Sequence, residues 1–130
     1  MQYDWNRPLL PGTVICSKYT TFNGNDVVGI FVVLYDEQSD NYISDSDNIV
    51  AIKLSSKGTC ISNYSVGVDT KLNDFMNEDS VACCSKLHTL HKKQQVYKVL
   101  GILHPATWHN IYKQYMKFAN NMQTQMMNEL

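Results

Sequence analysis

The spacing of apolar residues changes at Pro105, and this change constrains the fold more than any other feature of the sequence. Upstream, apolar residues form short β-branched and aromatic runs or alternate with polar ones, which is typical of strands. Downstream they recur at steps of three and four, which is typical of a helix with one apolar face. Because proline suits the first turn of a helix, where its missing N–H costs no hydrogen bond, we predict strands followed by a helix over residues 105–127. The apolar face of that helix comprises Trp108, Ile111, Tyr112, Tyr115, Ala119, Met122 and Met126.

Six strands are predicted before the helix, over residues 13–18, 27–35, 49–56, 60–68, 80–90 and 95–103. The strongest is VVGIFVVLY (27–35), which is apolar on both faces and should therefore be central in its sheet. Gly29 interrupts this run, where a bulge or the close approach of another backbone is expected. The first eleven residues should form an arm, because Pro8 and Pro11 prevent regular pairing.

Side chains on a strand alternate between two faces, which divides two of these strands into core-facing and outward-facing residues. The residues predicted to face the core are Val50, Ile52, Leu54, Val81, Cys83 and Leu87. Those predicted to face outward are Ile49, Ala51, Lys53, Lys86 and His88.

These elements predict a mainly β protein, in which a small, strongly bent antiparallel barrel of five to six strands packs against a C-terminal helix. The chain of 130 residues has the size of a single domain, which we place over residues 1–130 with residues 1–11 as its arm.

Charge is distributed unevenly along the chain. Residues 1–50 hold two basic and seven acidic side chains, whereas residues 51–130 hold nine lysines and five acids. The net charge of −1 gives no strong global field, so any binding of a polyanion should involve the second part.

No apolar run has the length of a signal peptide or a membrane span, which favours a cytoplasmic location without membrane contact. Thiols stay reduced in the cytosol. The four cysteines, Cys16, Cys60, Cys83 and Cys84, are therefore expected to be small core residues rather than two disulfides.

The stretch SKLHTLHKK (85–93) contains two histidines three residues apart, and it could be a metal site, a polar patch for an anionic chain, or one edge of a small barrel. A His-x-x-His pair chelates well on a helix, but here a strand leads into a turn, so His88 and His91 should project in different directions. No third ligand stands at a convincing spacing, and zinc needs three or four. We predict no metal and no cofactor.

Five segments of the chain resemble the MazF/PemK (Kid-like) toxins, in the same order and over about residues 11–120. They are PGTVI, VVGIFVVLYDE, NIVAIKLSSK, DSVACCSKLHTLHKKQQVYKVLGIL and GILHPATWHNIYKQYMKF. The resemblance implies an SH3-like barrel that forms homodimers and cleaves single-stranded RNA without metal. The abundance of Asn, Lys and Tyr fits a low-GC bacterium or its phage, and thus a phage or mobile element.

The chain departs from the family at its catalytic positions. The arginine that active members carry in the second strand falls on Gly29, and their threonine at the end of the third falls on Ser55. A late-strand arginine falls on His88, and an aspartate of the following turn falls on His91. Losing such a cation from its place typically lowers the rate ~10²–10³-fold.

Cleavage without metal uses the 2′-hydroxyl of RNA as the nucleophile and needs a base, a cation at the phosphate and an acid. Ser55 can hydrogen-bond a phosphate oxygen, and His88 can act as acid or base because its ordinary pKa lies near neutrality. The cations expected to bind RNA are Lys53, Lys57 and Lys86.

Two functions from different classes remain open. The first is a toxin-type endoribonuclease acting on single-stranded RNA through this rearranged site, with an antitoxin as partner. The second is a catalytically inactive MazF-fold protein of a phage or mobile element that inhibits or sequesters a host protein. Met122, Met126 and Met127 lie beyond the length the barrel needs, either as an adaptable contact surface or as a frayed tail.

Overall fold

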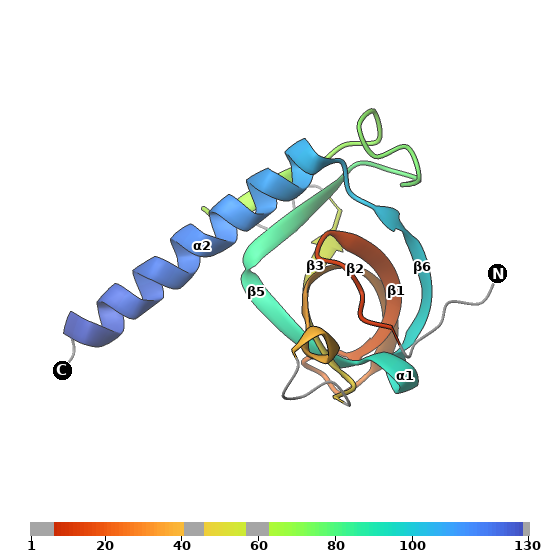
Figure 1. Ribbon diagram of the computed structural model, residues 1–130, viewed down its shortest axis with the longest axis horizontal. Coiled ribbons are helices and arrows are strands. Elements are labelled where there is room, and N and C mark those ends of the chain that lie inside the picture. Colours follow the sequence, from red (N-terminus) through yellow and green to blue (C-terminus); the bar gives the residue numbers. More distant parts are fainter. Residues whose placement is uncertain (1–6, 41–45, 57–62, 129–130) are drawn as a thin grey trace.

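The computed structural model describes residues 7–40, 46–56 and 63–128, which form a six-stranded antiparallel sheet and a long C-terminal helix (Figure 1). The strands are β1 (Thr13–Thr20), β2 (Asp26–Asp36), β3 (Asn48–Ser55), β4 (Ser65–Val68), β5 (Ser80–His91) and β6 (Val96–Ile102). The helices are the 3-10 turn η1 (Glu37–Ser39), the single turn α1 (Lys92–Gln95) and α2 (Pro105–Asn128). The predicted fold class is confirmed. Of the strand predicted over 60–68, residues 60–62 lie outside the described residues, and β4 begins at Ser65.

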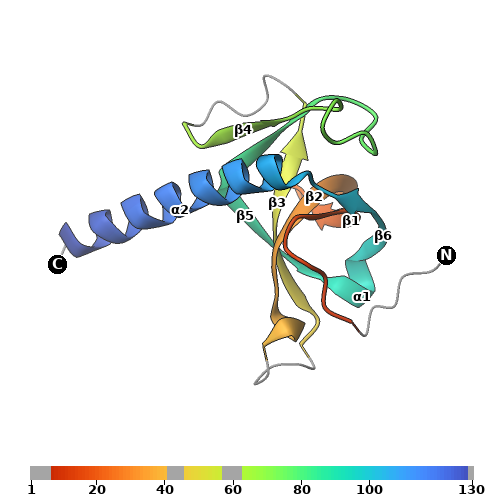
Figure 2. The same cartoon turned by 45° about the horizontal axis from the view of Figure 1, so that its top comes forward.

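The sheet curls strongly but does not close into a complete barrel. Its strand order is β4-β5-β3-β2-β1-β6, so β4 and β6 form the two edges (Figure 2). β2 lies between β1 and β3, as its apolar residues on both faces predicted, and Phe31, Val32 and Val33 are fully buried. Pairing between β1 and β2 is continuous through Gly29, so the bulge considered there is absent.

Both faces of the sheet are covered by apolar side chains. One face forms the helix-side cluster with α2, which contains Val14, Val32, Ile52, Leu54, Val68, Met76, Ala82, Cys84, Leu103 and Ile111. The other face forms the far-side cluster, which contains Leu9, Ile15, Phe31, Val33, Ile49, Ala51, Leu90 and Val96. The prediction that Ile49 and Ala51 face outward is therefore wrong, because β3 lies between two strands of a sheet with a core on each face. Val50, predicted to face the core, is only partly buried.

A wide bulge interrupts the pairing of β5 with β3. Ile52 pairs with Leu87 and Leu54 with Ala82, so two steps along β3 span five along β5. The three extra residues reverse the alternation of β5, because side chains on a strand alternate with period two. Leu87 therefore lies on the face of its partner Ile52 and not, as predicted, on the face of Cys83. It is 43% exposed there, so its predicted place in the core is wrong. Cys83, the first residue after the Leu54–Ala82 pair, still pairs with Ser65 of β4 and is buried as predicted, whereas Val81 is partly buried.

A buried asparagine holds the start of α2 against the loop that precedes β5. The amide nitrogen of Asn73 donates to the Asp69 carbonyl at 3.0 Å and to the Thr107 hydroxyl at 3.1 Å. Its amide oxygen accepts the backbone N–H of His104 at 2.8 Å. The imidazole Nδ1 of His104 in turn accepts the N–H of Ala106 at 3.1 Å, which satisfies one free donor of the helix.

The first half of α2 packs most closely on the sheet, and Phe118 and Asn121 of the second half contact Tyr64 just before β4. Ile111 is fully buried, and Trp108 and Tyr115 pack partly against the helix-side cluster. The second half projects past β4 and β5 (Figures 1 and 2), and Met122 and Met126 are exposed there, as is Met127. None of the helices in the described part of the chain has the length and apolar character that crossing a membrane requires.

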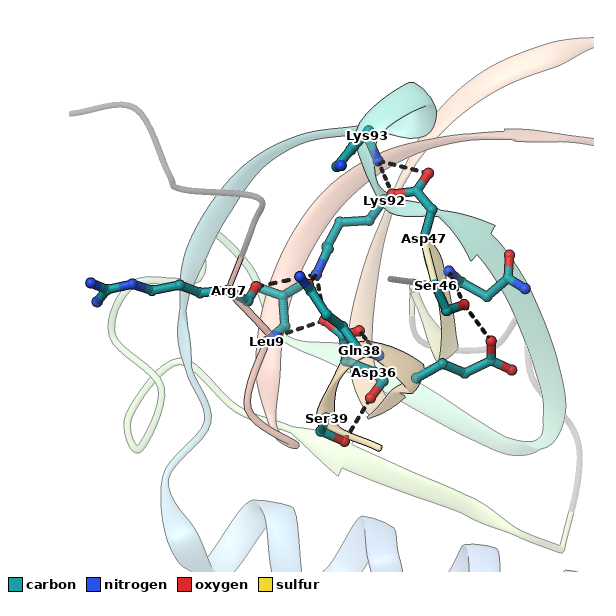
Figure 3. Close-up of polar contacts among 11 residues, drawn as sticks. Arg7, Leu9, Asp36, Gln38, Ser39, Ser46, Asp47, Lys92 and Lys93 are labelled. Atoms are coloured by element: carbon teal, nitrogen blue, oxygen red, sulfur yellow. Dashed lines mark hydrogen bonds and ion pairs between the residues drawn. The ribbon is translucent and has the colours of Figure 1, made fainter. Parts of the chain in front are cut away.

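A buried ion pair links Asp36, the last residue of β2, to Lys92, the residue that follows β5 (Figure 3). The ammonium of Lys92 lies 2.8 Å from the Asp36 carboxylate, and both side chains are almost fully buried. Lys92 also donates to the Arg7 carbonyl at 3.1 Å and to the side-chain oxygen of Gln38. Asp36 accepts the backbone N–H of Leu9 at 2.7 Å. The pair therefore attaches residues 7–9 of the arm to the sheet.

The cysteines differ in state. Cys83 is disulfide-bonded, so the prediction that all four cysteines are reduced core residues is wrong for this one. Cys16 and Cys84 are free thiols. Cys84 lies in the helix-side cluster, where burial raises the pKa of its thiol to about 11. Cys60 lies outside the described residues.

Candidate functional site

A groove of about 640 Å³ runs across one end of the sheet. It is bounded by the β1–β2 turn, the first part of β2, the end of β3 and the bulged part of β5. Its lining residues are Tyr19, Thr20, Thr21, Phe22, Val28, Gly29, Lys53, Leu54, Ser55, Ser56, Cys83, Lys86 and His88. Two of these side chains are lysines and none is a carboxylate, so the described wall favours an anionic ligand.

Four of the five predicted site residues line this groove: Lys53, Ser55, Lys86 and His88. Lys57 lies outside the described residues. Ser55 is the last residue of β3, and Lys53 precedes it by two on the same face. The other two come from β5 at and beyond the bulge, so two adjacent strands supply all four side chains.

The bulge explains how both odd-numbered and even-numbered residues of β5, which would face opposite sides of a regular strand, line one groove. Before it, Val81 pairs with Ser55, which gives Cys83 the face of Lys53. After it, His88 pairs with Ala51, two residues from Lys53 on that same face. A regular ladder would have turned His88 to the helix side of the sheet.

His88 is partly buried among aromatic rings rather than pointing freely outward. Its ring meets that of Phe31 edge-on, with 5.2 Å between centroids, and that of Tyr19 at 5.9 Å. Burial lowers the pKa of His88 below its ordinary value of 6.5, and the positive charges of Lys53 and Lys86 lower it further. The imidazole is therefore neutral at physiological pH and has a lone pair with which to accept a proton.

Gly29 lies in the groove lining, and nearby side chains crowd the position that a Cβ atom would occupy. A Cβ atom there would lie 2.8 Å from Cε1 of Tyr19, 3.3 Å from Phe31 and 3.4 Å from Cε of Lys53. The close approach expected at this glycine is thus made by side chains and not by another backbone. The ammonium of Lys53 lies over the Tyr19 ring, 5.1 Å from its centre. The ammonium of Lys53, from β3, accordingly lies beside Gly29, where β2 carries no side chain.

Two aromatic lining residues were not predicted from the sequence. Tyr19 and Phe22 fall in the segment YTTFNGNDV, between the strands predicted over residues 13–18 and 27–35. An apolar ring inside an otherwise polar turn was the available signal for Phe22. Tyr19 could have been assigned by extending the alternation of β1 past residue 18, since that strand ends at Thr20.

His91 does not belong to the groove. It is exposed at the end of β5, and its backbone N–H donates to the Gln95 side chain at 2.6 Å. Within the described ranges, no three His, Cys, Asp or Glu side chains are grouped as a metal site would require.

Comparison with known proteins identifies the fold. An endoribonuclease in complex with its cognate antitoxin, from mycobacterial species, superposes with a TM-score of 0.64 and 16% sequence identity, over 86% of this chain and 95% of that chain. A mycobacterial endoribonuclease gives 0.62 and 16%, over 88% and 93%. The MazE–MazF structure from Deinococcus radiodurans gives 0.63 and 12%, over 85% and 94%. No protein-family model and no curated protein matches the sequence. At these identities the likeness shows a shared fold, that of MazF-like toxins.

Proposed function

We propose that this protein, which has the MazF-like fold, is a toxin-type endoribonuclease that cleaves single-stranded RNA in the groove without metal. The observation that carries the proposal is the grouping of Lys53, Ser55, Lys86 and His88 in one groove, at the end of β3 and the bulge of β5. Structural neighbours across most of the chain include endoribonucleases.

His88 is proposed as the general base. Its lowered pKa keeps the imidazole neutral near pH 7, so that it can take the proton of the RNA 2′-hydroxyl. The 2′-oxygen then attacks the adjacent phosphorus, forming a 2′,3′-cyclic phosphate and breaking the bond to the 5′-oxygen. The leaving oxygen takes a proton from an ammonium group of the groove or from solvent.

The lysines and Ser55 would stabilise the charge that develops on the phosphate. Lys53 reaches the space beside Gly29, where the MazF/PemK family carries its arginine, and Tyr19 supports the lysine from below. Lys86 adds a second positive charge to the same lining, and the Ser55 hydroxyl can donate to a phosphate oxygen. A lysine lacks the two-pronged geometry of an arginine, so turnover should be slower than with an arginine in place.

The direct test is incubation of the purified protein with mixed single-stranded RNA in EDTA. We expect cleavage that leaves 2′,3′-cyclic phosphate ends, strongly reduced in Ser55→Ala and abolished in His88→Ala. Intact RNA with the wild-type protein, or equal cleavage by the His88 variant, would contradict the proposal.

A second function is favoured by one observation, the glycine at position 29. Tyr19 and Lys53 pack so closely on Gly29 that an arginine could not be introduced there without moving them. This suits a MazF-fold protein that has given up catalysis and binds a host protein instead. Under this reading the groove would bind RNA weakly or not at all.

Partners follow from the same fold. Two of the structural neighbours are complexes of a toxin with its antitoxin, MazE in the Deinococcus protein. We propose a cognate antitoxin for this chain and a homodimer as its working form. The exposed second half of α2, with Met122, Met126 and Met127, is an adaptable surface to which a partner could bind.

A further inference from the structure

Phe22 at the tip of the β1–β2 turn leaves its whole ring in water. Its relative exposure is 105%, against at most 67% for the other exposed large apolar residues of the described chain. A ring this exposed contributes almost nothing to folding, since apolar stabilisation scales with the area removed from water. The same ring lines the groove that contains Lys53 and His88.

The turn that carries Phe22 is held by its own hydrogen bonds. The N–H of Thr21 donates to the Asn25 carbonyl at 2.8 Å, and the N–H of Gly24 donates to the Thr21 carbonyl at 2.9 Å. The Thr21 hydroxyl accepts the N–H of Asn25 at 3.2 Å. Gly24 has φ of +85°, a left-handed conformation that suits glycine. The backbone under Phe22 is thus fixed before any ligand arrives, which lowers the entropy lost on binding.

Aromatic rings and ammonium groups share this groove. Tyr19 and Phe22 come from the β1 side, and Lys53 and Lys86 come from the β3 and β5 side. Grooves for single-stranded nucleic acid combine the same two elements, cations along the phosphates and rings on which unpaired bases stack. The lysines are suited to contact the phosphates of the RNA backbone, and the free face of the Phe22 ring is suited to stack on a base.

We propose that Phe22 is a stacking platform for an unpaired nucleobase of the RNA whose phosphate lies at Lys53 and Lys86. The inference rests on the proposed RNA-binding function and adds a requirement to it, since both faces of a base inside a duplex are covered by its stacked neighbours. Tyr19 remains below as the support of Lys53.

Binding is tested with a fluorescent single-stranded RNA carrying 2′-fluoro groups, which cannot be cleaved because it lacks the nucleophile. Phe22→Ala should weaken binding about 5- to 150-fold, the usual loss for one stacked base. Phe22→Trp should bind as tightly as the wild type or more tightly, whereas Phe22→Leu, apolar but without an aromatic face, should behave like Phe22→Ala. Tyr97→Ala, which removes an aromatic residue 53% exposed outside the groove lining, is the matched control and should leave affinity unchanged.

The outcomes separate this inference from the proposal beneath it. RNA binding that depends on Lys53 and Lys86 but is the same in Phe22→Ala overturns the stacking role alone. Leu at position 22 binding as well as Trp also overturns it, because an apolar contact would then suffice. No RNA binding by the wild-type protein overturns both. If Phe22→Ala instead fails only to bind a protein partner, the exposed ring belongs to a protein interface and the stacking role is wrong.

Discussion

Lys53 and Tyr19 meet above Gly29, with the lysine ammonium 5.1 Å from the centre of the tyrosine ring. The two residues come from strands that are not neighbours, since β2 lies between β1 and β3. Their contact crosses β2 at Gly29, which has no side chain. The contact positions the Lys53 ammonium, on which the proposed chemistry depends.

Gly29→Ala should disturb that contact. The added methyl would lie 2.8 Å from a ring atom of Tyr19, so the ring must move and Lys53 with it. Overpacking of this kind costs about 1–3 kcal/mol of unfolding free energy, and we expect weaker RNA binding as well. Denaturant unfolding measures the first effect. Gly67→Ala is the control, because a methyl group there meets nothing within 4 Å; equal stability of the two variants would contradict the packing argument.

The pH dependence of cleavage should report the lowered pKa of His88. A general base works when deprotonated, so the rate should rise with pH and level off, with a midpoint below 6.5. Lys53→Met removes one of the charges that lower the pKa of His88 and should raise it, as NMR titration of the imidazole would show. Lys93→Met, in α1 outside the groove lining, should leave that pKa unchanged. A midpoint above 6.5 would exclude His88 as the base.

Replacing Lys86 and His88 together by alanine should weaken binding of single-stranded RNA. Each lysine–phosphate contact contributes about −0.7 to the slope of log affinity against log salt, so the double variant should also show a shallower slope. Affinity measured at several salt concentrations gives both quantities. His91→Ala is the matched control, since that residue lies outside the groove. Unchanged affinity in the double variant would mean that this wall does not contact RNA.

Breaking the Lys92–Asp36 pair should destabilise the fold. Lys92→Met leaves the Asp36 carboxylate buried without its ammonium partner, which typically costs about 3–5 kcal/mol. Replacing both residues by apolar ones of similar size should cost less, because no buried charge is then left alone. Lys93→Met, at the exposed neighbouring residue, should be near neutral. Thermal and denaturant unfolding of the three variants decide the point.

A homodimer should appear in solution at micromolar concentration. Light scattering is expected to give twice the chain mass of 14.9 kDa. A monomer at that concentration would count against the proposed dimer and against any RNA groove that extends across two chains.

The strand positions and the helix start could be predicted from periodicity, because each element has a pattern several residues long. The predicted strand over 80–90 and the observed Ser80–His91 differ by one residue at the end, and α2 begins at Pro105. The faces of β5 could not be predicted, because alternation assumes an unbroken ladder and the bulge depends on pairing with β3. For the same reason Leu87 was assigned to the core, although it is 43% exposed.

The side-chain contacts in the groove could not be predicted from the apolar pattern of any single strand. Gly29 appears in the sequence only as an interruption, and the ring and lysine that cover it come from two other strands. Phe22 was visible as an apolar residue in a turn, but its complete exposure follows from the way the turn is folded. Side chains brought together from distant positions need the register of the sheet, which the sequence pattern alone does not provide.

The three additional residues in β5 have a consequence for how such a site can evolve. Because faces alternate with period two, gaining or losing an odd number of residues there exchanges the entire set of side chains presented downstream, without altering any of them. One insertion or deletion of this kind in β5 therefore changes more of the presented surface than one point substitution does. Divergent relatives of this chain would best be aligned by the length of the segment between Ala82 and Leu87, and only then by residue identity.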